Sequence, residues 1–182
     1  MPAVNATPNL LFHKLVGAEM TPGTGADGMD NYAAGSYRNG DLIVTQILVD
    51  IDDLLDGGTA GDIIGEDGVA NCHIGQITAA RNGTIVAGRM TCLELPAGGS
   101  DDIDLYSATE ATGTNDAAIS GLTESQLINH GAWTAGQVDD LTAWPAADSY
   151  LYLVSQGTGD AIYTAGKFLI ELYGIAPNVG NG

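Results

Sequence analysis

Four aspartates lie close together in the sequence, and carboxylates at this density could hold a hard cation. They are Asp50, Asp52, Asp53 and Asp56, at the end of an apolar segment. Ca²⁺ takes about six to eight oxygen ligands, which carboxylates from a loop can supply. The spacing differs from that of an EF-hand loop, because Leu54 occupies its third ligand position. We expect solvated carboxylates at the end of a strand and no metal, with a calcium site as the weaker alternative.

The histidines and cysteines show neither the spacing of a zinc site nor that of a nucleophile and its base. Zinc ligands usually come in pairs separated by two to four residues. Cys72 and His73 are adjacent, so on a strand their side chains would point to opposite faces and could not meet. No G-x-S-x-G segment and no typical pair of catalytic carboxylates occurs either. We therefore predict that the protein is not an enzyme and needs no cofactor.

The two cysteines, Cys72 and Cys92, are too few for a disulfide scaffold. We expect both to be free and buried, and a disulfide between them is the minority hypothesis.

A G-x-G-x-x-G sequence spans residues 23–28, but the residues after it do not form the amphipathic helix that a dinucleotide site needs. In a chain with 26 glycines, we attribute this match to chance.

Two tryptophans, Trp133 and Trp144, precede the aromatic residues Tyr150 and Tyr152. Together they could form a platform on which sugar rings stack. The competing interpretation is that the tryptophans anchor a long connection by packing inward, as large aromatics in polar segments usually do.

The charge is strongly negative: five Lys and Arg against 23 Asp and Glu give 5 − 23 = −18. Such a surface repels phosphate backbones and anionic lipids, so we expect no nucleic-acid partner and no membrane attachment. The first residues lack a basic segment followed by an apolar core, which predicts synthesis in the cytoplasm without a secretory signal. With 45% apolar residues and many glycines, the composition favours an all-β protein.

Alternating side chains identify the main strands. In residues 165–174, Phe168, Ile170 and Leu172 form an apolar face, and the residues between them carry both charges. Residues 150–154 form a second strand, which we expect to neighbour the first. Residues 41–55 are apolar on both faces, so this segment should be a central strand, covered by a second sheet on one side and by a subunit or loop on the other.

Other segments are predicted from turn and capping signals. Asn82-Gly83 favours a two-residue hairpin turn between strands at 71–80 and 84–95. Thr123 followed by Gln126 resembles a capping box and predicts one short helix at 124–130. Residues 103–107 should be a strand with Asp102 and Asp104 facing water. Glycine-rich surface loops are expected at 21–40 and 57–70.

We expect residues 1–20 to be an N-terminal arm or first strand, and residues 21–182 to be a single β-sandwich domain. The segments DLIVTQILVDIDDL and DSYLYLVSQGTGDAIYTAGKFLIELYG resemble the jelly-roll virion proteins of tailed bacteriophages, especially the capsid decoration or cement proteins of marine phages. This resemblance covers about half of the chain. It implies an antiparallel, jelly-roll-like β-sandwich on the outer capsid surface of the virion, often a trimer, that binds the major capsid protein and copies of itself.

On this interpretation the contacts come from the N-terminal arm and the first glycine-rich loop. The residues that we expect to make them are Leu10, Leu11, Phe12, Leu15, Tyr32 and Tyr37. The alternative is a glycan-binding module of a phage fibre or knob on the same fold, with Trp133 and Trp144 forming the site.

Overall fold

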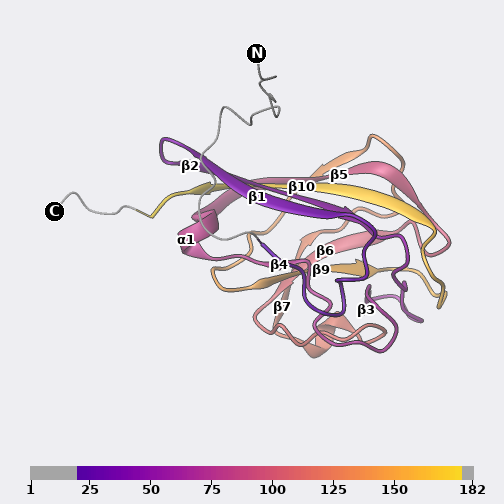
Figure 1. Ribbon diagram of the computed structural model, residues 1–182. Coiled ribbons are helices and arrows are strands. Elements are labelled where there is room, and N and C mark those ends of the chain that lie inside the picture. Colours follow the sequence, from indigo (N-terminus) through magenta and orange to yellow (C-terminus); the bar gives the residue numbers. More distant parts are fainter. Residues whose placement is uncertain (1–19, 178–182) are drawn as a thin grey trace, which may run out of the picture.

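The protein is a sandwich of two antiparallel sheets, described by a computed structural model over residues 20–177 (Figure 1). In the first sheet the strand order is β1 (Tyr32–Asn39), β2 (Leu42–Asp50), β10 (Ala165–Ile175), β5 (Thr84–Ala97), β8 (Val138–Asp140). In the second it is β3 (Asp62–Ile63), β9 (Tyr150–Ser155), β6 (Ile103–Ala108), β7 (Glu124–Ile128), with β4 (Gly75–Gln76) also paired to β9. The predicted all-β antiparallel sandwich is confirmed.

Strand β10 occupies the centre of the first sheet, between β2 and β5. Its alternation is as predicted: Phe168, Ile170 and Leu172 are fully buried against the second sheet. The expectation that residues 150–154 form a neighbouring strand is wrong, because β9 belongs to the second sheet. The loop between them therefore carries the chain from one sheet to the other.

Strand β2 is apolar on both faces, as predicted. Ile47 and Val49 point into the core and are fully buried, while Val44, on the opposite face, is only 5% exposed. In the strand order, however, β2 lies second, and β10 is the central strand.

Residues 32–39 form strand β1, so the prediction of a continuous loop over 21–40 is wrong. The strand pairs with β2 over its whole length, from Tyr32 opposite Val49 to Asn39 opposite Leu42. Gly40 has a φ of 62° in the hairpin turn, a conformation that glycine adopts without strain. The strand was missed because Ala33, Ala34 and Gly35 carry too little side chain to show an alternating pattern.

The predicted hairpin at Asn82-Gly83 is also wrong. Residues 79–82 form the short helix α1, whose N-terminus is capped by the Thr78 side chain accepting a hydrogen bond from the Arg81 N–H. Gly83 ends the helix with a φ of 70°. Asn82 is consequently buried inside the sandwich, where a turn residue would have been exposed.

The only α-helix in the described residues is α1, and the helix predicted at 124–130 is strand β7. Thr123 does not cap a helix. Its hydroxyl and N–H both donate to the Glu110 carboxylate, at 2.8 and 2.9 Å. A further turn of 3-10 helix, η1 (Ile119–Gly121), precedes this strand.

Cys72 and Cys92 are free and buried, as predicted. Cys72 lies against the loop that contains the G-x-G-x-x-G sequence, and a Cβ on Gly25 would lie 2.5 Å from its Sγ. These glycines therefore allow two loops to pack closely.

Candidate functional site

The aspartates at the end of β2 do not gather around one point. The Asp50 carboxylate is buried and pairs with Lys167 Nζ at 3.1 Å. The Asp56 carboxylate accepts hydrogen bonds from the N–H groups of Ser100 and Ala161, both at 2.9 Å. Asp52 accepts from the neighbouring Asp53 N–H. In residues 20–177 no group of three or more His, Cys, Asp or Glu side chains could hold a metal ion. The calcium hypothesis therefore has no geometry to support it.

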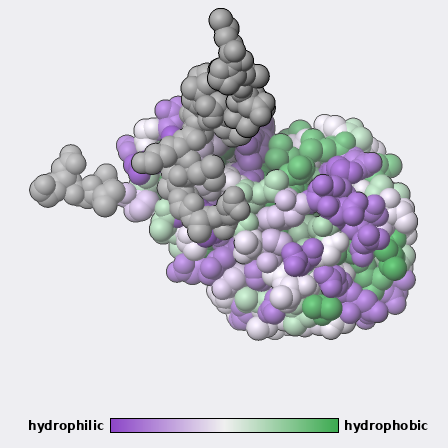
Figure 2. All heavy atoms as spheres, viewed as in Figure 1, coloured by the Kyte–Doolittle hydropathy of each residue, from purple (hydrophilic) through white to green (hydrophobic). Residues whose placement is uncertain are grey.

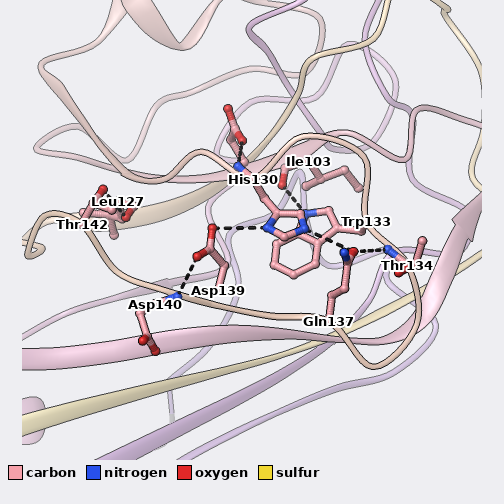
Figure 3. A network of polar contacts seen from close by, with 10 residues as sticks. Ile103, Leu127, His130, Trp133, Thr134, Gln137, Asp139, Asp140 and Thr142 are labelled. Carbon is pink, nitrogen blue, oxygen red and sulfur yellow. Dashed lines mark hydrogen bonds and ion pairs between the residues drawn. The ribbon is translucent and has the colours of Figure 1, made fainter.

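His130 lies at the centre of the polar network in Figure 3. Its Nδ1 lies 3.3 Å from Asp139 Oδ2, and its Nε2 lies 3.2 Å from Gln137 Oε1. The Gln137 oxygen also accepts from the Thr134 N–H at 2.6 Å. Trp133 stacks on the imidazole, with ring centroids 3.8 Å apart and an interplanar angle of 20°.

Both ring nitrogens of His130 thus lie within hydrogen-bond distance of side-chain oxygen atoms. Neither nitrogen can reach a substrate without breaking one of these contacts. The network instead fastens the connection between β7 and β8 to the sandwich. Trp133 contributes by donating from Nε1 to the Ile103 carbonyl at 2.7 Å.

The same connection buries Asp104, for which the prediction of a water-facing side chain is wrong. Asp104 is 1% exposed. Its carboxylate accepts from the Gln126 amide at 2.8 Å, the Gln156 amide at 2.9 Å and the His130 N–H at 3.1 Å. Burial raises the pKa of this carboxyl group, although the three donors oppose the shift. Asp102, by contrast, is partly exposed.

The outer face of the first sheet carries many apolar side chains, and the second sheet lies against the opposite face (Figure 1). Cross-strand register arranges its side chains in rows. One row crosses all five strands and consists of Ala33, Leu48, Leu169, Thr91 and Val138, of which only Thr91 is polar; we call it the first apolar row. A second apolar row consists of Tyr37, Val44, Tyr173 and Ala87. We call these rows and the charged rows beside them the outer sheet face.

A polar row separates the two apolar rows. Glu171 accepts from Gln46 Nε2 at 3.0 Å and from Arg89 Nε at 2.6 Å, and Asp140 lies opposite Arg89. At the end of the sheet, Lys167 pairs with Asp50 and Glu94.

The outer sheet face holds two cations and four anions, so its net charge is 2 − 4 = −2, compared with −18 for the whole chain. The cations are Arg89 and Lys167, and the anions are Asp50, Glu94, Asp140 and Glu171. The acidic character of the protein is therefore concentrated elsewhere on its surface. Figure 2 shows hydrophobic and hydrophilic residues interspersed on the side in view.

The residues predicted to make contacts fall in different places. Leu10, Leu11, Phe12 and Leu15 lie outside the described residues. Tyr37 lies on the outer sheet face. Tyr32 points toward the interior instead, where its hydroxyl donates to the Ile74 carbonyl at 2.8 Å.

The two tryptophans do not form one platform. Trp133 is fully buried, which agrees with the inward-packing interpretation, whereas Trp144 is 51% exposed. Trp144 lines two cavities at one end of the sandwich, of about 120 and 300 Å³. Sequence reasoning missed the serines and threonines beside it, because they come from separate segments that only strand pairing brings together.

No protein-family model, curated protein or solved structure matches the chain. Within residues 20–177, no helix has the length and apolarity needed to cross a lipid bilayer.

Proposed function

We propose that this protein is a structural component of a virus particle: a capsid decoration protein on the outside of a tailed-bacteriophage head. The observation that carries the proposal is the outer sheet face. Two apolar rows cross it, with Leu48, Leu169, Tyr37 and Tyr173 all half-buried. A partner that covers these half-buried apolar side chains removes apolar surface from water, and this stabilises the complex.

The charge distribution supports self-association through this face. A protein of net charge −18 repels its own copies at most orientations. On the outer sheet face the cations Arg89 and Lys167 are already paired with carboxylates. Two copies, or a copy and a capsid subunit, can approach here with little repulsion. We propose a trimer that binds the major capsid protein.

The resemblance of residues 41–55 and 148–174 to phage decoration proteins supplies the biological setting. Strong acidity suits a position outside the shell, because a protein that faces packaged DNA is normally basic. In this setting the protein is made in the host cytoplasm, joins the virion and stabilises the shell without catalysing a reaction.

The test measures the copy number of this chain relative to the major shell protein in purified particles, together with its oligomeric state by light scattering. We expect a stoichiometric virion protein and an oligomer in solution. Leu169→Glu places a charge in the first apolar row and should abolish both associations. The control Ile162→Glu alters an apolar residue that is 56% exposed outside the first sheet and should abolish neither. A stable monomer with no affinity for particles would exclude the proposal.

A further inference from the structure

Trp144 is a large aromatic residue held at the surface by a well-anchored backbone. It is 51% exposed, whereas Pro145 beside it is buried. The segment that carries it is fixed on both sides. The Thr142 N–H donates to the Leu127 carbonyl at 2.8 Å, and the Asp148 N–H donates to the Ile77 carbonyl at 2.7 Å. The backbone that carries the indole is therefore fixed in place, which lowers the entropic cost of ordering this segment when a ligand binds.

The smaller cavity beside Trp144, of about 120 Å³, is lined by polar residues together with Ala108, Ala146 and the indole itself. Ser107 and Ser125 contribute hydroxyl groups from opposite positions in the β6–β7 pair. Glu124 also lines the cavity, but as the neighbour of Ser125 in β7 its side chain points to the opposite face of the strand. The hydroxyl and the N–H of Thr123 both donate to the Glu110 carboxylate. Residues that carry hydroxyl groups thus line the cavity beside the indole.

The larger cavity, of about 300 Å³, has a different character. It lies between the start of β5 and the segment after Trp144, and it is lined by small and apolar residues, among them Ala79, Ile85, Pro145 and Ala147. Trp144 and Ala146 line both cavities. The site therefore combines one aromatic surface, one apolar hollow and one group of hydroxyls.

A pyranose ring matches this combination, because it has an apolar C–H face and a rim of hydroxyl groups. The face can stack on an indole, and the rim can bond to serine, threonine and carboxylate side chains. We propose that Trp144 and the two cavities form a binding site for neutral carbohydrate. This activity goes beyond the proposed structural role and does not depend on it.

The charge of the protein narrows the ligand class. Glu124 lines the site, Asp148 lies four residues after Trp144, and the chain as a whole carries −18. Sialylated or sulfated glycans and nucleic acids would be repelled. A proline-rich peptide can also pack on an exposed indole, but it offers few partners for the hydroxyl groups of Ser107 and Ser125. The neutral saccharide is therefore the favoured ligand.

The experiment screens the full chain against an array of neutral, sialylated and sulfated oligosaccharides, with a panel of proline-rich peptides alongside. The neutral glycan that binds best is then titrated by calorimetry and by tryptophan fluorescence. We expect binding to neutral glycans only. Trp144→Ala should weaken it by at least about tenfold, and Trp144→Phe should retain most of it. Ser125→Ala, which removes one exposed hydroxyl, should weaken it by a smaller factor.

Fluorescence supplies an internal control. In Trp144→Phe the remaining tryptophan, Trp133, is fully buried, so the ligand should no longer change the emission. Ile162→Ala, an exposed apolar residue outside both cavities, should bind as the wild type does. The proposal is overturned if no neutral glycan binds, if binding is confined to anionic glycans or peptides, or if a folded Trp144→Ala binds normally. Particle association is measured separately, so a failure here leaves the structural proposal standing.

Discussion

Asn82 donates a hydrogen bond from Nδ2 to the Thr45 hydroxyl at 2.9 Å, and this bond joins the end of helix α1 to the inner face of β2. Both residues are fully buried. The Asn82 side-chain oxygen, Oδ1, accepts from the Thr78 N–H at 2.8 Å, and the Ser36 hydroxyl lies 2.8 Å from that of Thr45. A small polar cluster is thus enclosed at one end of the apolar core.

We predict that Asn82→Leu destabilises the protein by about 2 to 4 kcal/mol, because it leaves the buried Thr45 hydroxyl and Thr78 N–H without this partner. Urea denaturation measures the change in the free energy of unfolding. Ala80→Ser, at an exposed position in the same helix, is the control and should change it by less than about 0.5 kcal/mol. Equal effects of the two variants would contradict the structural role of Asn82.

Glu171→Gln should lower stability at neutral pH by about 1 kcal/mol, a modest figure because the partner Arg89 is 45% exposed. Burial alone would raise the pKa of Glu171, but hydrogen bonds from Gln46 and Arg89 outweigh it and leave the pKa below its ordinary value of 4.5. The ionised Glu171 side chain therefore stabilises the fold fully above pH 4.5, its ordinary pKa. This stabilisation is lost as the pH falls through the lower pKa that Glu171 has in the folded protein.

Denaturation of both proteins across this pH range tests the prediction. The stability curves of wild type and Glu171→Gln should converge in acid. Asp160→Asn removes an exposed carboxylate and should follow the wild type throughout. A constant difference at all pH values would show that Glu171 acts through packing and not through its charge.

His73 should make the fold sensitive to mild acid. Its ring centroid lies 4.7 Å from that of Tyr150, and its buried Nδ1 has no hydrogen-bond partner in the described part of the chain. Burial lowers the pKa of His73 below its ordinary value of 6.5. As the pH falls below 6.5 the unfolded chain binds a proton that the folded protein does not, so stability decreases until the folded pKa is reached.

We expect His73→Phe to flatten this part of the stability curve, because phenylalanine keeps a ring beside Tyr150 and cannot titrate. Thermal unfolding between about pH 7 and pH 5 gives the slopes. Parallel curves for the two proteins would assign the acid sensitivity to other groups.

Neither cysteine should react with a thiol reagent in the folded protein. Burial raises the pKa of the Cys72 thiol to about 11, so little thiolate is present at neutral pH, and burial raises that of Cys92 as well. We expect no thiols to react in the native state and two to react after denaturation without a reductant. No reactive thiols after denaturation would instead indicate a disulfide.

The strands predicted at 84–95 and 103–107 are confirmed as β5 and β6. The strands with the clearest signal are those with large side chains. Strands β2, β9 and β10 carry runs of Ile, Val, Leu, Phe and Tyr, so the hydrophobic pattern of the sequence alone identifies them. Pairing is different, because it depends on segments far apart in the sequence. Nothing local to Phe168 indicates that its strand lies between residues 42–50 and 84–97.

The sequence Arg-Asn-Gly occurs twice, at residues 38–40 and 81–83, and adopts a different local structure in each place. Asn39 and Gly40 lead into the turn between β1 and β2, whereas Asn82 and Gly83 end a helix. The distinguishing signal is Thr78, whose side chain caps the first turn of that helix. Similarly, the contrast between Trp133 and Trp144 required the tertiary structure, since both lie in polar segments of similar composition.

The place of β10 in the first sheet has a consequence for biosynthesis. Strands β2 and β5 have no common neighbour until residues 165–175 leave the ribosome, because β10 is the strand that joins them. A nascent chain shorter than this can form the β1–β2 hairpin but cannot complete the first sheet. We therefore expect the first sheet to form only after synthesis of β10, and its apolar rows to come together only in chains that include this strand.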